Sequence, residues 1–187
     1  MTILKEYTNS KHREVEALPM IQCIMKGPSV EQYVYYLYEL KEIYRVLESH
    51  ANQKGILNGL DGIERYQNLV NDIDELHLNY SRSLHNETLQ YFNYLDNLVL
   101  INSKMLLAHV YVRHMGDLYG GKLMARVVPG SGTAYNFSNR PELIKAFNNK
   151  LTLDLANEAN VAFDFFIRIF KSMWNKIKDN NENSKKD

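Results

Sequence analysis

The stretch YVRHMGDLYGGKLMARVV, residues 111–128, combines helical periodicity with three glycines and a carboxylate. On a helical wheel one face contains Arg113, Gly116, Asp117, Gly120 and Met124, with Gly121 beside them. Each glycine costs a helix about 1 kcal/mol relative to alanine, but bare backbone permits a kink or the close approach of another group. Tight helix packing is the alternative, although a carboxylate on such a contact face is costly unless it is satisfied. The pattern favours a flat ligand against the helix, with ordered water near Asp117.

A second group of residues lies near the N-terminus, in LKEYTNSKHREVE. His12 and Glu16 are four residues apart and therefore neighbours on one helical face, and Lys5 lies in the same sector. An apolar stripe runs alongside them: Ile3, Leu4, Tyr7, Val15 and Leu18. A carboxylate beside a histidine can orient the ring and raise its basicity as a metal ligand. A solvated surface pair is the alternative, since such pairs are common on exposed helices.

The composition limits the class of protein that can carry these residues. The chain has 187 residues, enough for one domain with a core, and 22 basic residues balance 22 acidic ones, which argues against nucleic acid as a partner. The single cysteine, Cys23, excludes an intrachain disulfide and fits a reducing compartment. The N-terminus is too charged for a signal peptide, and no apolar run approaches the length of a membrane span. We expect a cytoplasmic protein without a membrane segment.

Helical periodicity dominates the sequence, and no stretch alternates convincingly with the period of a strand. We therefore expect a single all-α domain of about seven to nine helices over residues 1–179, followed by a polar, disordered tail at 180–187. The expected helices are residues 3–18, 30–53, 63–70, 72–81, 87–101, 103–128, one that begins near Pro141, and 153–178. Ser29 and Asn86 are expected caps, and Pro141 suits a first helical turn.

Taken together, the segments HVYVRHMGDLYGG and LKEYTNSKHREVE resemble the distal and proximal helices of haem oxygenases. The distance between them in the sequence and the all-α pattern agree with this resemblance. It implies a multi-helix fold in which haem lies between an N-terminal proximal helix and a glycine-kinked distal helix.

The resemblance also implies roles for individual residues on the proximal side. His12 would be the iron ligand, Glu16 would orient its ring, and Lys5 would lie near a haem propionate. Tyr111 would contact the propionate side of the haem. Phe163 and Phe170 match aromatic residues of the last helix that wall the pocket.

On the distal side, Gly116 and Gly120 would lie over the haem plane, with Gly121 next to them. Asp117 would anchor an ordered water network that Arg113 and Tyr44 join.

Several positions depart from the family pattern. Asn148 and Asn149 lie where an arginine usually pairs with a propionate, so Lys145 or Lys150 is the expected substitute. Three further replacements are Phe166 for an asparagine, His114 for a tyrosine and Tyr119 for a small residue.

By resemblance, haem b would be both cofactor and substrate, cleaved with O₂ at the α-meso carbon to biliverdin IXα, CO and Fe²⁺. The chain has no flavin or nicotinamide fingerprint, so its electrons would come from a partner, either ferredoxin, which we favour, or a flavoprotein reductase. The main alternative is a haem-binding or storage protein that does not degrade haem. A thiamin-pyrimidine hydrolase would need a nucleophilic cysteine, and a plain helical interaction module would leave Asp117 unexplained.

Overall fold

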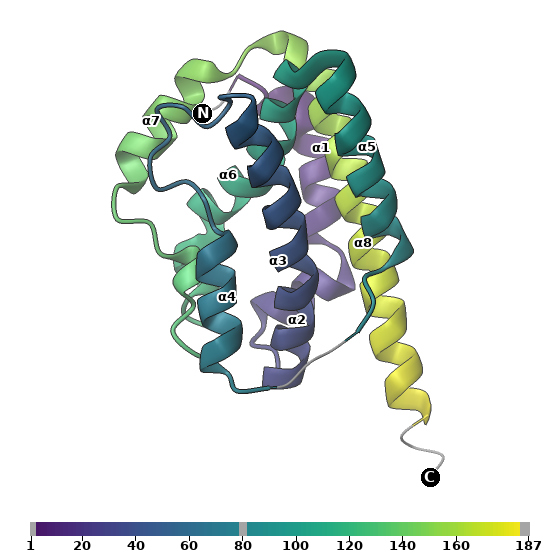
Figure 1. Cartoon of the computed structure of the whole chain (residues 1–187). Coiled ribbons are helices and arrows are strands. Elements are labelled where there is room, and N and C mark those ends of the chain that lie inside the picture. Colours follow the sequence, from purple (N-terminus) through teal and green to yellow (C-terminus); the bar gives the residue numbers. More distant parts are fainter. Residues whose placement is uncertain (1–2, 79–81, 184–187) are drawn as a thin grey trace.

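The computed structural model describes residues 3–78 and 82–183, and over these residues the chain is helical, with no strand. The α-helices are α1 (Lys5–Glu16), α2 (Pro19–Met25), α3 (Val30–Gln53), α4 (Tyr66–Glu75), α5 (Asn86–Asn102), α6 (Leu106–Met124), α7 (Arg140–Lys150) and α8 (Ala156–Asn183) (Figure 1). Three 3₁₀ turns connect them: η1 (Ser103–Met105), η2 (Thr133–Tyr135) and η3 (Leu153–Leu155). The all-α prediction is confirmed.

Two long helices organise the packing. Helix α8 lies against α1, α2, α5 and α6, whereas α3 lies against α4, α5 and α6 (Figure 1). The core between them is unusually aromatic, and its largest fully buried side chains include Tyr33, Tyr36, Tyr44, Tyr91, Phe147, Phe166 and Phe170. Helix α6 therefore has the core on one side, while part of its other side remains free to form a cavity with α1.

The expected capping residues are mostly in place. Ser29 forms a capping box at the start of α3: its hydroxyl accepts from the Gln32 amide at 3.2 Å, and the Gln32 side chain accepts from the Ser29 amide at 2.9 Å. Pro141 lies in the first turn of α7. Asn86 is the first residue of α5, and His85 takes the cap position instead.

Some boundaries differ from the sequence prediction. Helix α1 spans Lys5–Glu16 where residues 3–18 were expected, and Pro19, the expected stop, is the first residue of α2, because a proline fits the first turn of a helix. One helix, α4, replaces the two expected at 63–70 and 72–81, and residues 79–81 lie outside the described part. Helix α6 runs without interruption through all three glycines and ends at Met124. Helix α8 continues past Lys178 to Asn183, so the expected disordered tail begins as helix, and residues 184–187 lie outside the described part.

Within residues 3–78 and 82–183, none of the helices combines the length and the apolar character that a membrane crossing requires.

Candidate active site

A cavity of about 620 Å³ lies between α1 and α6. This volume is within the range of about 300–1,000 Å³ that is typical of small-molecule sites. Seven residues predicted from the sequence line it: Lys5, His12, Glu16, Tyr111, Gly116, Gly120 and Phe163. The structure thus brings residues from the N-terminal helix, the glycine-rich helix and α8 to one cavity.

His12 presents its ring to the cavity from α1. Its Nδ1 lies 3.5 Å from Glu16 Oε2, and its ring meets Phe163 edge to face at a centroid distance of 6.0 Å. Helix α1 is fixed to α8 by an ion pair of 2.6 Å between Lys11 Nζ and Asp164 Oδ1. Among the described residues Nε2 has no hydrogen-bond partner, so this nitrogen is available as a ligand.

The buried face of α1 differs from the predicted apolar stripe. Ile3 and Tyr7 are exposed, whereas Thr8 is buried. The Thr8 hydroxyl donates to the Leu4 carbonyl at 3.0 Å and lies 3.5 Å from the Tyr111 hydroxyl. A small polar residue of α1 therefore faces Tyr111 of α6 at the cavity.

The three glycines of α6 face different surroundings. A Cβ atom added at Gly116 or Gly120 would meet nothing within 4 Å, so their backbone is open toward the cavity. A Cβ atom at Gly121 would lie 3.0 Å from the Tyr135 carbonyl oxygen and 3.2 Å from the Tyr135 Cβ. Gly121 lies next to Gly120 but outside the cavity lining, and it permits the close approach of the segment that contains Tyr135.

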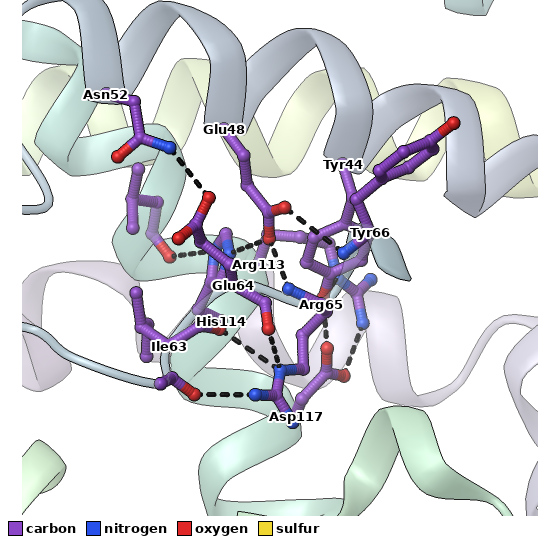
Figure 2. Close-up of polar contacts among 12 residues, drawn as sticks. Tyr44, Glu48, Asn52, Ile63, Glu64, Arg65, Tyr66, Arg113, His114 and Asp117 are labelled. Atoms are coloured by element: carbon purple, nitrogen blue, oxygen red, sulfur yellow. Dashed lines mark hydrogen bonds and ion pairs between the residues drawn. The ribbon is translucent and has the colours of Figure 1, made fainter. Parts of the chain in front are cut away.

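Behind the cavity-lining glycines, Tyr44, Arg113 and Asp117 form a closed polar cluster between α3 and α6 (Figure 2). The Tyr44 hydroxyl donates to Asp117 Oδ2, and Arg113 Nη2 donates to Asp117 Oδ1 at 2.7 Å. Arg113 Nε also donates to the Tyr44 hydroxyl at 2.9 Å. Burial raises the pKa of Tyr44 well above its ordinary value, so its phenol remains a proton donor. The three predicted residues are in mutual contact at the interface between α3 and α6, and none of them lines the cavity.

Three predicted ligand contacts lie elsewhere. Phe170 is in the core, where it packs against Tyr36 and Phe166 at centroid distances of 5.9 and 6.0 Å. Lys145 is exposed and Lys150 half-buried on α7, and neither lines the cavity. Helix α7 packs on α6, and the two lysines lie outside the cavity lining, so their pairing with a propionate stays a prediction. Lys5 is the cavity-lining residue with a positive charge at neutral pH.

Five cavity residues were missed by the sequence analysis: Thr8, Asn9, Val112, Met115 and Tyr119. Helical spacing could have indicated most of them. Thr8 and Asn9 precede His12 by four and three residues, and Val112 and Tyr119 flank Gly116 by four and three.

Comparisons with known proteins agree on one family. The family model described as "Heme oxygenase" matches residues 1–150. The chain is 26% identical to "Heme oxygenase 1" of Nostoc sp. over 91% of its own length and 84% of that protein. It is 29% identical to the "Heme oxygenase" of Rhodella violacea, over 44% of each chain.

Solved structures of low sequence identity have the same fold. The structure of heme oxygenase-2 from Synechocystis sp. in complex with heme and NO has a TM-score of 0.81 at 22% identity, over 94% of this chain and 85% of that one. Heme oxygenase-1 from the same genus in complex with heme has a TM-score of 0.80 at 18% identity, over 97% and 96%.

Proposed function

The chain belongs to the haem oxygenase family, and on this premise we propose that it degrades haem with O₂ and externally supplied electrons. The proposed cleavage is at the α-meso carbon, with biliverdin IXα, CO and Fe²⁺ as products. The proposed electron donor is a ferredoxin, with a flavoprotein reductase as the alternative. The observation that supports the proposal is the placement of the Tyr44–Arg113–Asp117 cluster directly behind open glycine backbone in the cavity that His12 lines.

The cavity residues suit haem as the ligand. His12 would bind the iron through Nε2, while Glu16 lies on the Nδ1 side of the ring and can orient it. The absence of side chains at Gly116 and Gly120 leaves room for a flat macrocycle against α6. Lys5 can pair with a propionate at the cavity edge. When bound, haem would supply both the iron that activates O₂ and the carbon skeleton that is oxidised.

The remaining residues would control protons and hydrogen bonds. A neutral histidine ligand lacks the electron donation of a thiolate, which favours O–O cleavage in other haem enzymes. Tyr44 and Arg113 are weak acids that Asp117 holds in place, so the cluster can order water and relay a proton without exposing a strong acid. A protein that only stores haem needs His12 but has no use for such a cluster.

The hydrolase alternative is not favoured by the surroundings of the cysteine. Cys23 is half-buried on α2, and burial raises the pKa of its thiol. A nucleophilic cysteine requires the opposite shift.

The test is aerobic turnover of the haem complex. The protein is reconstituted with hemin, supplied with ascorbate, catalase and an iron chelator, and followed by its absorption spectrum. Loss of the Soret band with growth of a biliverdin band would support the proposal, and chromatography against the four biliverdin isomers would test the α-meso assignment. Turnover with reduced ferredoxin or with a flavoprotein reductase would then identify the donor class.

Two outcomes would contradict the proposal. A Soret band that forms and persists, with a donor that is competent on another haem oxygenase, would indicate a haem-binding protein. No Soret band would exclude His12 as the ligand.

A further inference from the structure

A second buried polar network lies next to the Tyr44–Arg113–Asp117 cluster, around His114 of α6 (Figure 2). The His114 side chain is fully buried. Its Nε2 lies 2.9 Å from Glu48 Oε1 on α3, and its Nδ1 lies 3.3 Å from the Val110 carbonyl oxygen. A backbone carbonyl can only accept a hydrogen bond, so the Nδ1 contact requires a proton on that nitrogen.

Whether His114 Nε2 carries a proton depends on whether Glu48 is ionised. Glu48 is buried, and its two oxygens accept from the backbone amides of Arg65 at 2.6 Å and Tyr66 at 3.1 Å, at the N-terminus of α4. Amides at a helix N-terminus stabilise a negative charge, which favours the carboxylate. The Arg65 guanidinium is engaged elsewhere, since it donates to the carbonyls of Gly62 and Asn136. A carboxylate can only accept a hydrogen bond, so the contact of Nε2 with Glu48 requires a proton on that nitrogen as well, and both ring nitrogens of His114 are then protonated.

His109, one turn earlier on α6, shows the contrasting case. It is also fully buried beside a carboxylate, with Nε2 2.9 Å from Glu158 Oε1. Its Nδ1, however, lies 3.0 Å from the Tyr91 hydroxyl, which can donate. Burial lowers the pKa of His109, in agreement with a neutral ring. The two buried histidines of α6 are therefore expected to differ in charge.

His114 also touches the proposed site directly. Its ring meets the Tyr44 ring at a centroid distance of 4.9 Å and an angle of 78°. The Tyr44 hydroxyl in turn donates to Asp117. A positive charge beside a phenol ring attracts the ring and strengthens its hydroxyl as a hydrogen-bond donor.

We propose that His114 is a cationic positioning residue: its imidazolium, held between Glu48 and the Val110 carbonyl, fixes Tyr44 as the donor to Asp117. The role rests on the proposed function, in which Asp117 acts next to the haem. Among the described residues, the titratable groups that face the His114 ring are Glu48 and Tyr44, both from α3.

The charge can be tested on the haem-free protein, independently of any turnover. Long-range ¹H–¹⁵N correlation spectra report the protonation of each imidazole nitrogen at neutral pH. We expect His114 to have both nitrogens protonated and His109 to have an unprotonated Nδ1. In Glu48→Gln, which removes the counter-charge, His114 should become neutral. An unprotonated nitrogen on His114 in the unaltered protein would overturn the proposal, whether or not the chain degrades haem.

The positioning role can be tested by single-turnover kinetics of the haem complex. His114→Gln should slow haem degradation about fivefold, the effect of losing one hydrogen-bonding interaction, with unchanged haem affinity. His114→Tyr keeps a donor for Glu48 but no charge, and should be equally slow. The matched control, His109→Gln, removes the other buried histidine–glutamate pair and should retain the rate. A normal rate in His114→Tyr, or equal slowing in the control, would overturn the role of the charge.

Discussion

Alanine at Gly121 is expected to destabilise the protein, whereas alanine at the adjacent Gly120 is not. The added methyl group at position 121 would lie 3.0 Å from the Tyr135 carbonyl oxygen and 3.2 Å from the Tyr135 Cβ, so the backbone at Tyr135 would have to shift by a few tenths of an ångström. The same carbonyl accepts a hydrogen bond from Arg140 Nη2 at 3.1 Å, so a shift would also weaken that bond. At position 120 the methyl group would meet nothing within 4 Å.

The size of the effect follows from two opposing contributions. Overpacking a filled site costs about 1–3 kcal/mol, and replacing glycine by alanine within a helix returns up to about 1 kcal/mol. For Gly121→Ala we expect the free energy of unfolding to fall by about 1–2 kcal/mol, which lowers Tm by about 2–8 °C for a chain of this size. For Gly120→Ala there is no overpacking cost, and only the higher helix propensity of alanine acts. The haem-free protein should therefore be unchanged or up to about 1 kcal/mol more stable.

Haem binding should be affected by the substitution at position 120 rather than by the one at position 121. Gly120 lines the cavity and Gly121 does not, so hemin titrations followed at the Soret band should show weaker binding for Gly120→Ala. Urea unfolding followed by far-UV circular dichroism gives the stability of the haem-free variants. Equal destabilisation by both substitutions, or weaker haem binding only in Gly121→Ala, would refute the assignment of Gly120 to the cavity and of Gly121 to the contact with Tyr135.

Three further predictions concern the ligand, the cluster and the second buried histidine. His12→Ala should lose the axial bond, and an unchanged haem spectrum would exclude this ligand. Asp117→Ala should still bind haem but turn it over about 10²-fold more slowly, because Tyr44 and Arg113 lose their common acceptor; a normal biliverdin yield would contradict this. Burial lowers the pKa of His109, so stability should be lost as the pH falls below its ordinary value of about 6.5, where the unfolded chain binds the proton more readily. His109→Gln should reduce the difference in urea midpoint between about pH 7.5 and pH 5.5. An unchanged difference would show that His109 is not the source of the pH dependence.

The predicted residues that the structure brings to one cavity include pairs whose relation is fixed within a single helix. His12 and Glu16 share a face of α1 because they are four residues apart, and the same holds for Gly116 and Gly120 on α6. The spacing of residues along one helix needs no knowledge of its neighbours. Local geometry therefore placed the central residues of both cavity walls.

The predicted residues that lie outside the cavity lining depend on which helix packs beside them. Gly121 is only 100° from Gly120 on the wheel, and only the position of η2 shows that it faces Tyr135. Phe163 and Phe170 are seven residues apart on one face of α8, yet α8 passes from the cavity to the core between them. Lys150 lies on α7, which packs on α6, and the sequence of its own segment does not show on which side of α6 it lies.

Helix α6 must be stabilised by something other than its intrinsic preference. Its three glycines cost about 3 kcal/mol relative to alanine, yet the helix is continuous from Leu106 to Met124. The adjoining side of the helix offers the compensation: the Arg113–Asp117 ion pair of 2.7 Å lies along the helix, and Tyr44 fixes it to α3. Because breaking a buried charge pair is far more costly than one glycine, the cluster can hold open backbone in a helical conformation. The residues proposed to supply protons would thus also maintain the helix that leaves room for the ligand.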